Sequence, residues 1–145
     1  MDGDGSLMLQ IKKRKGLKSR SWRFMCTICF YQDKRHREPL EWIREILEIG
    51  YLSHRKDGMS ELRINGFKQV QGIIKDLLPY IKFKRTQALA MSEACEILID
   101  NRASYLSENN LRKLVALVLK IQESNYVTKA KKSEAMLLSV LGLTP

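Results

Sequence analysis

Residues 21–32 read SWRFMCTICFYQ and alternate between two kinds of side chain. One set is apolar and consists of Trp22, Phe24, Cys26, Ile28 and Phe30. The other set is mostly polar or long and consists of Ser21, Arg23, Met25, Thr27, Cys29 and Tyr31. Because successive side chains of a strand point to opposite faces, this pattern predicts a strand with one buried and one outward face.

The stretch before it, residues 6–13, alternates in the same way, with Leu7, Leu9 and Ile11 on the apolar side. Residues 15–20 lie between the two stretches and contain Gly16, which is typical of a turn. Together the two stretches predict a β-hairpin.

A second hairpin and several helices are predicted further along the chain. A helix is expected from near Pro39 to a stop at Gly50, followed by strands over 51–55 and 59–64 around the turn at 56–58. Helical spacing of apolar residues predicts helices over 67–77, about 84–99, 111–121 and 134–141. The order ββαββα indicates an α+β fold: a four-stranded antiparallel sheet with helices on one face, plus C-terminal helices. We expect residues 1–100 to form the core and residues 101–145 a helical extension of the same domain.

The charge of the chain is concentrated near its N-terminus. The 145 residues carry a formal net charge of +10, and ten Lys or Arg lie between Lys12 and Arg37 with one acid, Asp33. Such a face favours a polyanionic partner, most often a nucleic acid backbone. No apolar run approaches the roughly 20 residues of a membrane span, no signal peptide is visible, and three cysteines favour a reducing compartment.

Few residues have a spacing that is typical of a catalytic or metal-binding site. The turn Asp2-Gly3-Asp4-Gly5-Ser6 could hold a divalent cation through carboxylate and carbonyl oxygens, or could be a simple acidic turn. Cys26 and Cys29 have the spacing of a zinc motif, but residues three apart on a strand face opposite ways. We therefore expect Cys26 in the core and Cys29 at the surface without zinc, and we expect His36 and His54 to be surface residues.

Several of these segments, taken in order, resemble one family. The DGDGS turn before a strand is similar to the C-terminal half of the LAGLIDADG motif. Gln32 at the end of the second strand, Glu41-Trp42-Ile43, Gly50-Tyr51-Leu52 and the run LPYIKFKRTQA at 78–88 follow with the family's spacing. Over about residues 1–100 the chain thus resembles the single-motif LAGLIDADG homing endonucleases.

The resemblance implies a cleavage centre. Asp4 matches the catalytic acid, and the backbone carbonyl of Gly3 would bind the same cation, Mg²⁺ or another divalent ion. Gln32 matches a position that helps to organise metal-bound water, and Lys84 matches a basic residue that reaches the same pocket. His36 occupies a place that usually holds Arg or Lys.

The resemblance also implies double-stranded DNA as the partner, read in the major groove by the outward strand face. The parity of the strands puts these residues on that face: Ser6, Met8, Gln10, Lys12, Arg14, Arg23, Met25, Thr27, Cys29, Ser53, Arg55, Glu61 and Arg63. Phosphate contacts are expected from Lys13, Lys15, Lys18 and Lys34.

One motif per chain implies a homodimer, because each subunit would supply half of the cleavage centre. In the family a helix of small and apolar residues precedes the acidic turn. This sequence starts at Met1, directly before the acidic turn, so most of that helix does not appear in it; a homodimer is expected if the helix is present.

The alternatives to an endonuclease are an inactive nucleic-acid-binding remnant, an intron RNA maturase or regulator on the same scaffold, and a structural or protein-binding role. An organelle-encoded origin in a chloroplast or mitochondrion also follows from the resemblance.

Overall fold

The computed structural model describes residues 2–3, 5–13, 22–101, 105–125 and 131–144. Within these ranges four strands form one antiparallel sheet in the order β1-β2-β4-β3. They are β1 (Gly5–Lys13), β2 (Trp22–Asp33), β3 (Tyr51–His54) and β4 (Met59–Asn65). The α+β fold with two antiparallel hairpins predicted from the alternation is confirmed.

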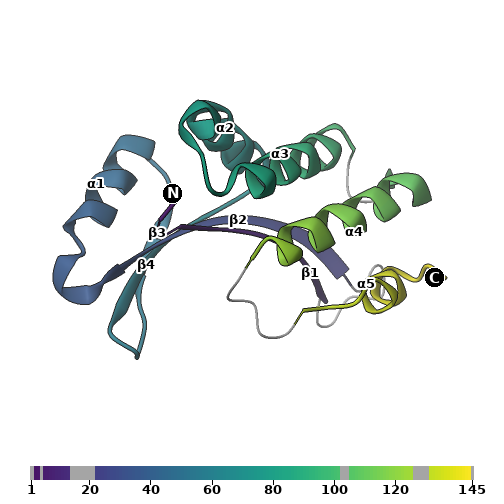
Figure 1. Cartoon of the computed structure of the whole chain (residues 1–145), viewed down its shortest axis with the longest axis horizontal. Coiled ribbons are helices and arrows are strands. Elements are labelled where there is room, and N and C mark those ends of the chain that lie inside the picture. The colour runs from purple at the N-terminus through teal and green to yellow at the C-terminus, as the bar shows by residue number, and fades with distance from the viewer. Residues whose placement is uncertain (1, 4, 14–21, 102–104, 126–130, 145) are drawn as a thin grey trace.

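The helices lie on one side of an arched sheet (Figure 1). They are α1 (Glu38–Leu47), α2 (Phe67–Leu77), α3 (Arg85–Asp100), α4 (Glu108–Glu123) and α5 (Glu134–Leu141), with short 3-10 turns η1 (Lys34–His36) and η2 (Leu78–Tyr80). α5 lies beside the β1 edge of the sheet (Figure 1). In the described parts of the chain no helix is both long and apolar enough to cross a membrane.

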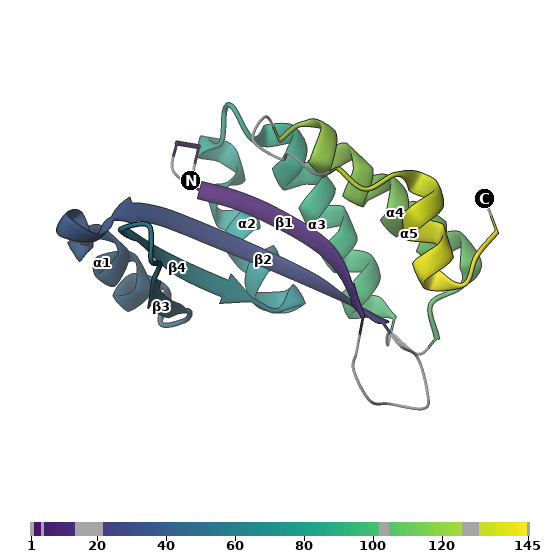
Figure 2. The ribbon, with the colours of Figure 1, turned by 90° about the horizontal axis from the view of Figure 1, so that it is seen from below.

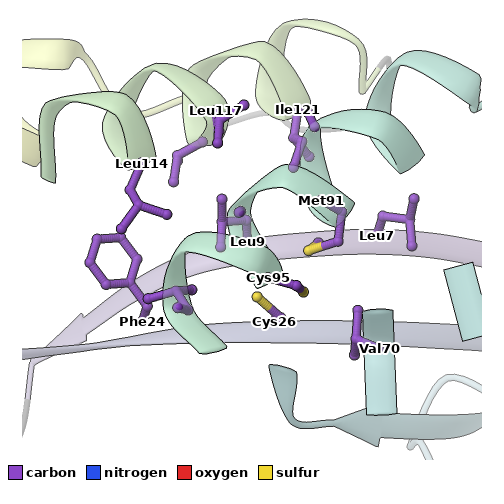
Figure 3. Packing of buried hydrophobic residues seen from close by; sticks show 14 of the residues in the cluster. Leu7, Leu9, Phe24, Cys26, Val70, Met91, Cys95, Leu114, Leu117 and Ile121 are labelled. Atoms are coloured by element: carbon purple, nitrogen blue, oxygen red, sulfur yellow. The ribbon is translucent and has the colours of Figure 1, made fainter. Parts of the chain in front are cut away.

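The core fills the space between the sheet and the helices. Leu7, Ile28 and Leu62 project from the strands and are at most 1% exposed. Figure 3 shows strand residues such as Leu9 and Phe24 facing side chains of α3 and α4. Fully burying a side chain of this size contributes roughly 1.5–3 kcal/mol, so this contact positions α3 firmly over β1 and β2.

Cys26 of β2 and Cys95 of α3 meet inside this core, as expected for Cys26 (Figure 3). A hydrogen bond with Cys95, together with burial, raises the pKa of the Cys26 thiol far above its ordinary value. The Cys26 thiol is therefore a neutral packing group, and Cys95 is buried beside it.

The end of α1 differs from the prediction. Glu48, not Gly50, takes the left-handed conformation that ends the helix, with φ 53°. Gly50 is needed for another reason: its φ is 103°, and a Cβ there would lie 2.9 Å from Cδ1 of Leu62. The glycine thus lets the chain pass close over β4 as it enters β3.

Candidate active site and nucleic-acid interface

Lys84 lies just before α3 and reaches the N-terminal turn. Its Nζ donates to the carbonyl oxygen of Gly3 at 2.9 Å and to that of Gly5. Gly5 is the first residue of β1, so the ammonium lies at the end of the sheet where β1 begins. Two carbonyl oxygens directed at one ammonium make a site that favours positive charge.

Asp2 fastens the same turn to α3. Its carboxylate accepts the backbone N–H groups of Lys82 at 2.5 Å, Phe83 at 3.2 Å and Lys84 at 3.1 Å. These bonds, that from Lys82 most of all, lower the pKa of Asp2 below its ordinary value. The N-cap residue Lys84 makes no side-chain cap bond to α3, and Asp2 supplies the acceptor for the N–H groups just ahead of the helix.

The sequence pattern named Asp2 only as part of a possible cation-binding turn and did not predict its contact with residues 82–84. Its partners are about eighty residues away along the chain, and an aspartate before a turn is too common to indicate a distant contact. The sequence signal that could have indicated a role at the site is that Asp2 lies next to the motif residues Gly3 and Asp4.

Gln32 is the second-last residue of β2. The pairing of β1 with β2 begins with Gly5 opposite Phe30, and Gln32, two residues further along β2, pairs with Ser60 of β4. The Gln32 Oε1 accepts the backbone N–H of Asp33 at 3.0 Å, which orients the side-chain amide. Asp4, the predicted catalytic acid, lies outside the described residues. Of the other predicted catalytic and metal-binding residues, Gly3 and Lys84 are in contact, and Gln32 lies two residues beyond the Phe30 that pairs with Gly5.

A pocket of about 540 Å³ opens beside Lys84. The start of β1 forms one wall, and the beginning of α3 and the end of α4 form the others. Gln87 is buried in this wall, and its Nε2 donates to the carbonyl of Ser124 at 2.9 Å, which ties α3 to α4. Phe83 also lines the pocket but is 88% exposed. The site is therefore open to a large ligand.

The sheet face opposite the helices is open. Figure 2 views the molecule from this side, with α2 and α3 behind the strands. The predicted outward residues of β1, β2 and β4 lie on this face. In β1 and at the start of β2 buried residues alternate with more exposed ones, and hydrogen bonds join Glu61 and Arg63 of β4 to their neighbours there. Those that are half-buried or exposed are Ser6, Met8, Gln10, Lys12, Arg23, Met25 and Arg63. Ser53 of β3 joins them through Glu61, whereas Arg55 lies in the turn after β3.

Three predicted outward residues are covered by their neighbours. Thr27 is 2% exposed, Cys29 0% and Glu61 8%, so the prediction of exposure was wrong for these side chains, including Cys29 as a surface cysteine. Thr27 Oγ1 donates to Oδ1 of Asn65 at 2.7 Å. Burial raises the pKa of the Cys29 thiol and of its neighbour Tyr31. Alternation determines the face of a side chain, but neighbours on that face determine its exposure.

Three exposed basic residues lie at the end of β1 and β2 that is far from Lys84. Lys12 pairs directly opposite Arg23, and both are exposed, as is Lys13. No ion pair involves these three side chains within the described ranges. Lys34 and His36 are exposed in η1. Arg14, Lys15, Lys18 and the predicted turn at 15–20 lie outside the described residues.

A divalent cation fits the N-terminal turn. The described residues contain no group of three or more His, Cys, Asp or Glu side chains that could enclose a metal. Mg²⁺ does not need such a cage, because it usually takes one or two carboxylates and completes its shell with water and substrate phosphates. The Gly3 carbonyl oxygen accepts from the Lys84 ammonium, so it is turned toward the side of the pocket where positive charge gathers.

The family profile described as LAGLIDADG endonuclease matches residues 1–98. The chain belongs to this family. Among curated LAGLIDADG relatives, DNA endonuclease I-CvuI of Chlorella vulgaris is 34% identical over 88 residues, which is 61% of this chain and 54% of I-CvuI. This LAGLIDADG chain thus aligns with about half the length of that relative.

Solved structures share the LAGLIDADG fold. The homing endonuclease I-CvuI, in complex with the I-CreI target in the presence of 2 mM Mg and with the DNA not cleaved, superposes with a TM-score of 0.82 at 24% identity, covering 97% of this chain and 87% of that one. The archaeal intron-encoded homing endonuclease I-Vdi141I, complexed with DNA, superposes with a TM-score of 0.80 at 23% identity, covering 97% and 89%. These likenesses establish the LAGLIDADG fold over 97% of the chain.

Proposed function

We propose that this LAGLIDADG protein is a sequence-specific double-stranded DNA endonuclease of the homing type that hydrolyses phosphodiester bonds with Mg²⁺ or another divalent cation. The contact between Lys84 and Gly3 carries the proposal. It lies at one end of a sheet whose open face bears polar and basic side chains. A duplex along that face would bring a phosphate group to the Lys84 ammonium.

Each residue of the site has a separate role in hydrolysis. The Gly3 carbonyl and the Asp4 carboxylate would hold the cation. When bound, the cation supplies activation of water and neutralisation of charge on the phosphate. Lys84 stabilises the negative charge that develops on the phosphate oxygens. Gln32 orients a water molecule through its side-chain amide.

Two copies of the chain would form the complete enzyme. One Asp4 per chain supplies the acid for one strand, whereas cutting a duplex requires one for each strand. Tyr80 is 77% exposed and Phe83 is 88% exposed, and Phe83 lies directly beside the Asp2 carboxylate. Such apolar surface next to the catalytic turn supports a second copy covering it.

Asp4→Asn tests the proposal. The probe is a supercoiled plasmid library that carries a randomised insert, incubated with Mg²⁺. We expect the wild type to linearise a subset of plasmids, and we expect Asp4→Asn to bind the same subset without cutting. Asp76→Asn, an exposed acid on α2, is the matched control and should cut normally.

Two results would contradict the proposal. Cleavage that survives Asp4→Asn would place the catalytic acid elsewhere. A wild-type protein that binds DNA or RNA but never cuts, with any divalent cation, would favour the inactive binder or the maturase. An organelle-encoded origin stays a prediction from the family resemblance.

A further inference from the structure

A buried carboxylate lies in the middle of the open face. Only 11% of the Glu61 side chain is exposed, although it sits among outward-facing residues. Its Oε1 accepts from Ser53 Oγ at 3.0 Å and from an Arg63 guanidinium nitrogen at 2.9 Å. Its Oε2 accepts from Cys29 Sγ at 3.8 Å. Both oxygens are therefore engaged by side chains of β2, β3 and β4.

This carboxylate holds Arg63 in place. The Arg63 side chain is 31% exposed, and its Nε is buried and has no hydrogen-bond partner among the described residues. The Nε side of the guanidinium is thus buried in the sheet face, and one terminal nitrogen donates a charge-assisted hydrogen bond to Glu61. Its outer end is the part that a ligand on the open face can reach.

The other described arginines of this interface are held differently. Arg55 pairs with Asp57 at 2.7 Å in the turn after β3, and about half of each side chain is exposed. Arg23 is exposed opposite Lys12. Neither is seated against a buried acid, so each must lose more side-chain freedom than Arg63 when it binds.

We infer that Arg63 is the residue with which this face selects guanine, and that Glu61 is its positioning residue rather than a reader of bases. The inference rests on the proposed function, because it requires the face to lie in a major groove. Arginine can donate two bonds to O6 and N7 of guanine, and a well-formed pair of this kind discriminates by roughly 5- to 150-fold. A pre-positioned guanidinium retains more of that discrimination.

Selection from a randomised duplex DNA library tests this assignment. The wild type should enrich a G·C pair at one position in each half of the selected site. Arg63→Gln and Glu61→Gln should each reduce that preference by about 5- to 150-fold and leave the other positions unchanged. Asp57→Asn is the matched control, since it removes the acid of an exposed Arg pair, and it should keep the preference.

Different outcomes separate the two claims. A wild type that enriches no sequence overturns the proposed function and this inference with it. Enrichment that Glu61→Gln leaves intact overturns the inference alone. So does a G·C preference that Glu61→Gln abolishes but Arg63→Gln retains, because the carboxylate would then read the base itself. If Glu61→Gln does not fold, Arg63→Lys decides: it keeps the charge but loses the planar fork, and an undiminished preference overturns the inference.

Discussion

Replacing Lys12 and Arg23 with Gln should stabilise the free protein while weakening its binding to DNA. The two residues pair directly opposite each other on β1 and β2. Like charges in this arrangement destabilise a sheet, and relieving them should raise the free energy of unfolding by roughly 0.2–1 kcal/mol at low salt. Two like charges that destabilise the free sheet are expected at a position where both bind phosphate groups.

The effect on binding follows from counterion release. Each neutralised phosphate contributes about 0.9 to the slope of log affinity against log salt, so Lys12→Gln/Arg23→Gln should lower that slope by about 1.8. Extrapolated over the tenfold change from about 1 M to about 0.1 M salt, this difference in slope corresponds to roughly a 60-fold loss of affinity at the lower salt concentration. The assay is fluorescence anisotropy with a labelled duplex between about 50 and 200 mM salt, combined with urea unfolding of the free protein.

Lys68→Gln/Lys75→Gln is the matched control, because it removes two exposed charges from α2 on the helical side of the sheet. Its salt slope should equal that of the wild type. An equal decrease in both double variants would refute the reasoning, since total charge rather than the open face would then drive binding. A wild-type slope in Lys12→Gln/Arg23→Gln would refute it as well.

Three further predictions concern the active site and the core. Lys84→Met should lower the cleavage rate by about 10²- to 10³-fold and leave duplex affinity nearly unchanged, as measured by single-turnover cleavage and anisotropy; an unchanged rate would remove Lys84 from the site. Asp2→Ala should lower the melting temperature at neutral pH, because the pKa of Asp2 is depressed in the folded state. That stabilisation is fully present above the unfolded pKa and is lost as pH falls through the folded pKa, so the two melting curves should converge below about pH 4, and a constant gap would contradict this. Met91→Ala, at a side chain that is 0% exposed, should lower the free energy of unfolding by about 2–5 kcal/mol in urea titrations, and a change below about 1 kcal/mol would show that the core around α3 is loosely packed.

Local patterns predicted most of the fold. Period-two alternation in β1 and β2 identified the buried side chains Leu7 and Ile28, because the side-chain direction in a strand depends only on the parity of the position. The LPYIKFKRTQA run led to Lys84 before any contact was known. The role of Asp2 could not be predicted, because its acceptor function depends on three N–H groups that folding brings from residues 82–84.

The amino-acid sequence by itself determined the order of the elements, the face on which each strand residue lies and the family motif, all of which follow from neighbouring positions. Tertiary structure alone decided which polar side chains on the open face are covered. Glu61 and Arg63 are both outward by parity, yet the first is buried and the second reaches solvent. The difference arises because side chains from three strands converge on the carboxylate, and the register between strands is a property of the folded chain.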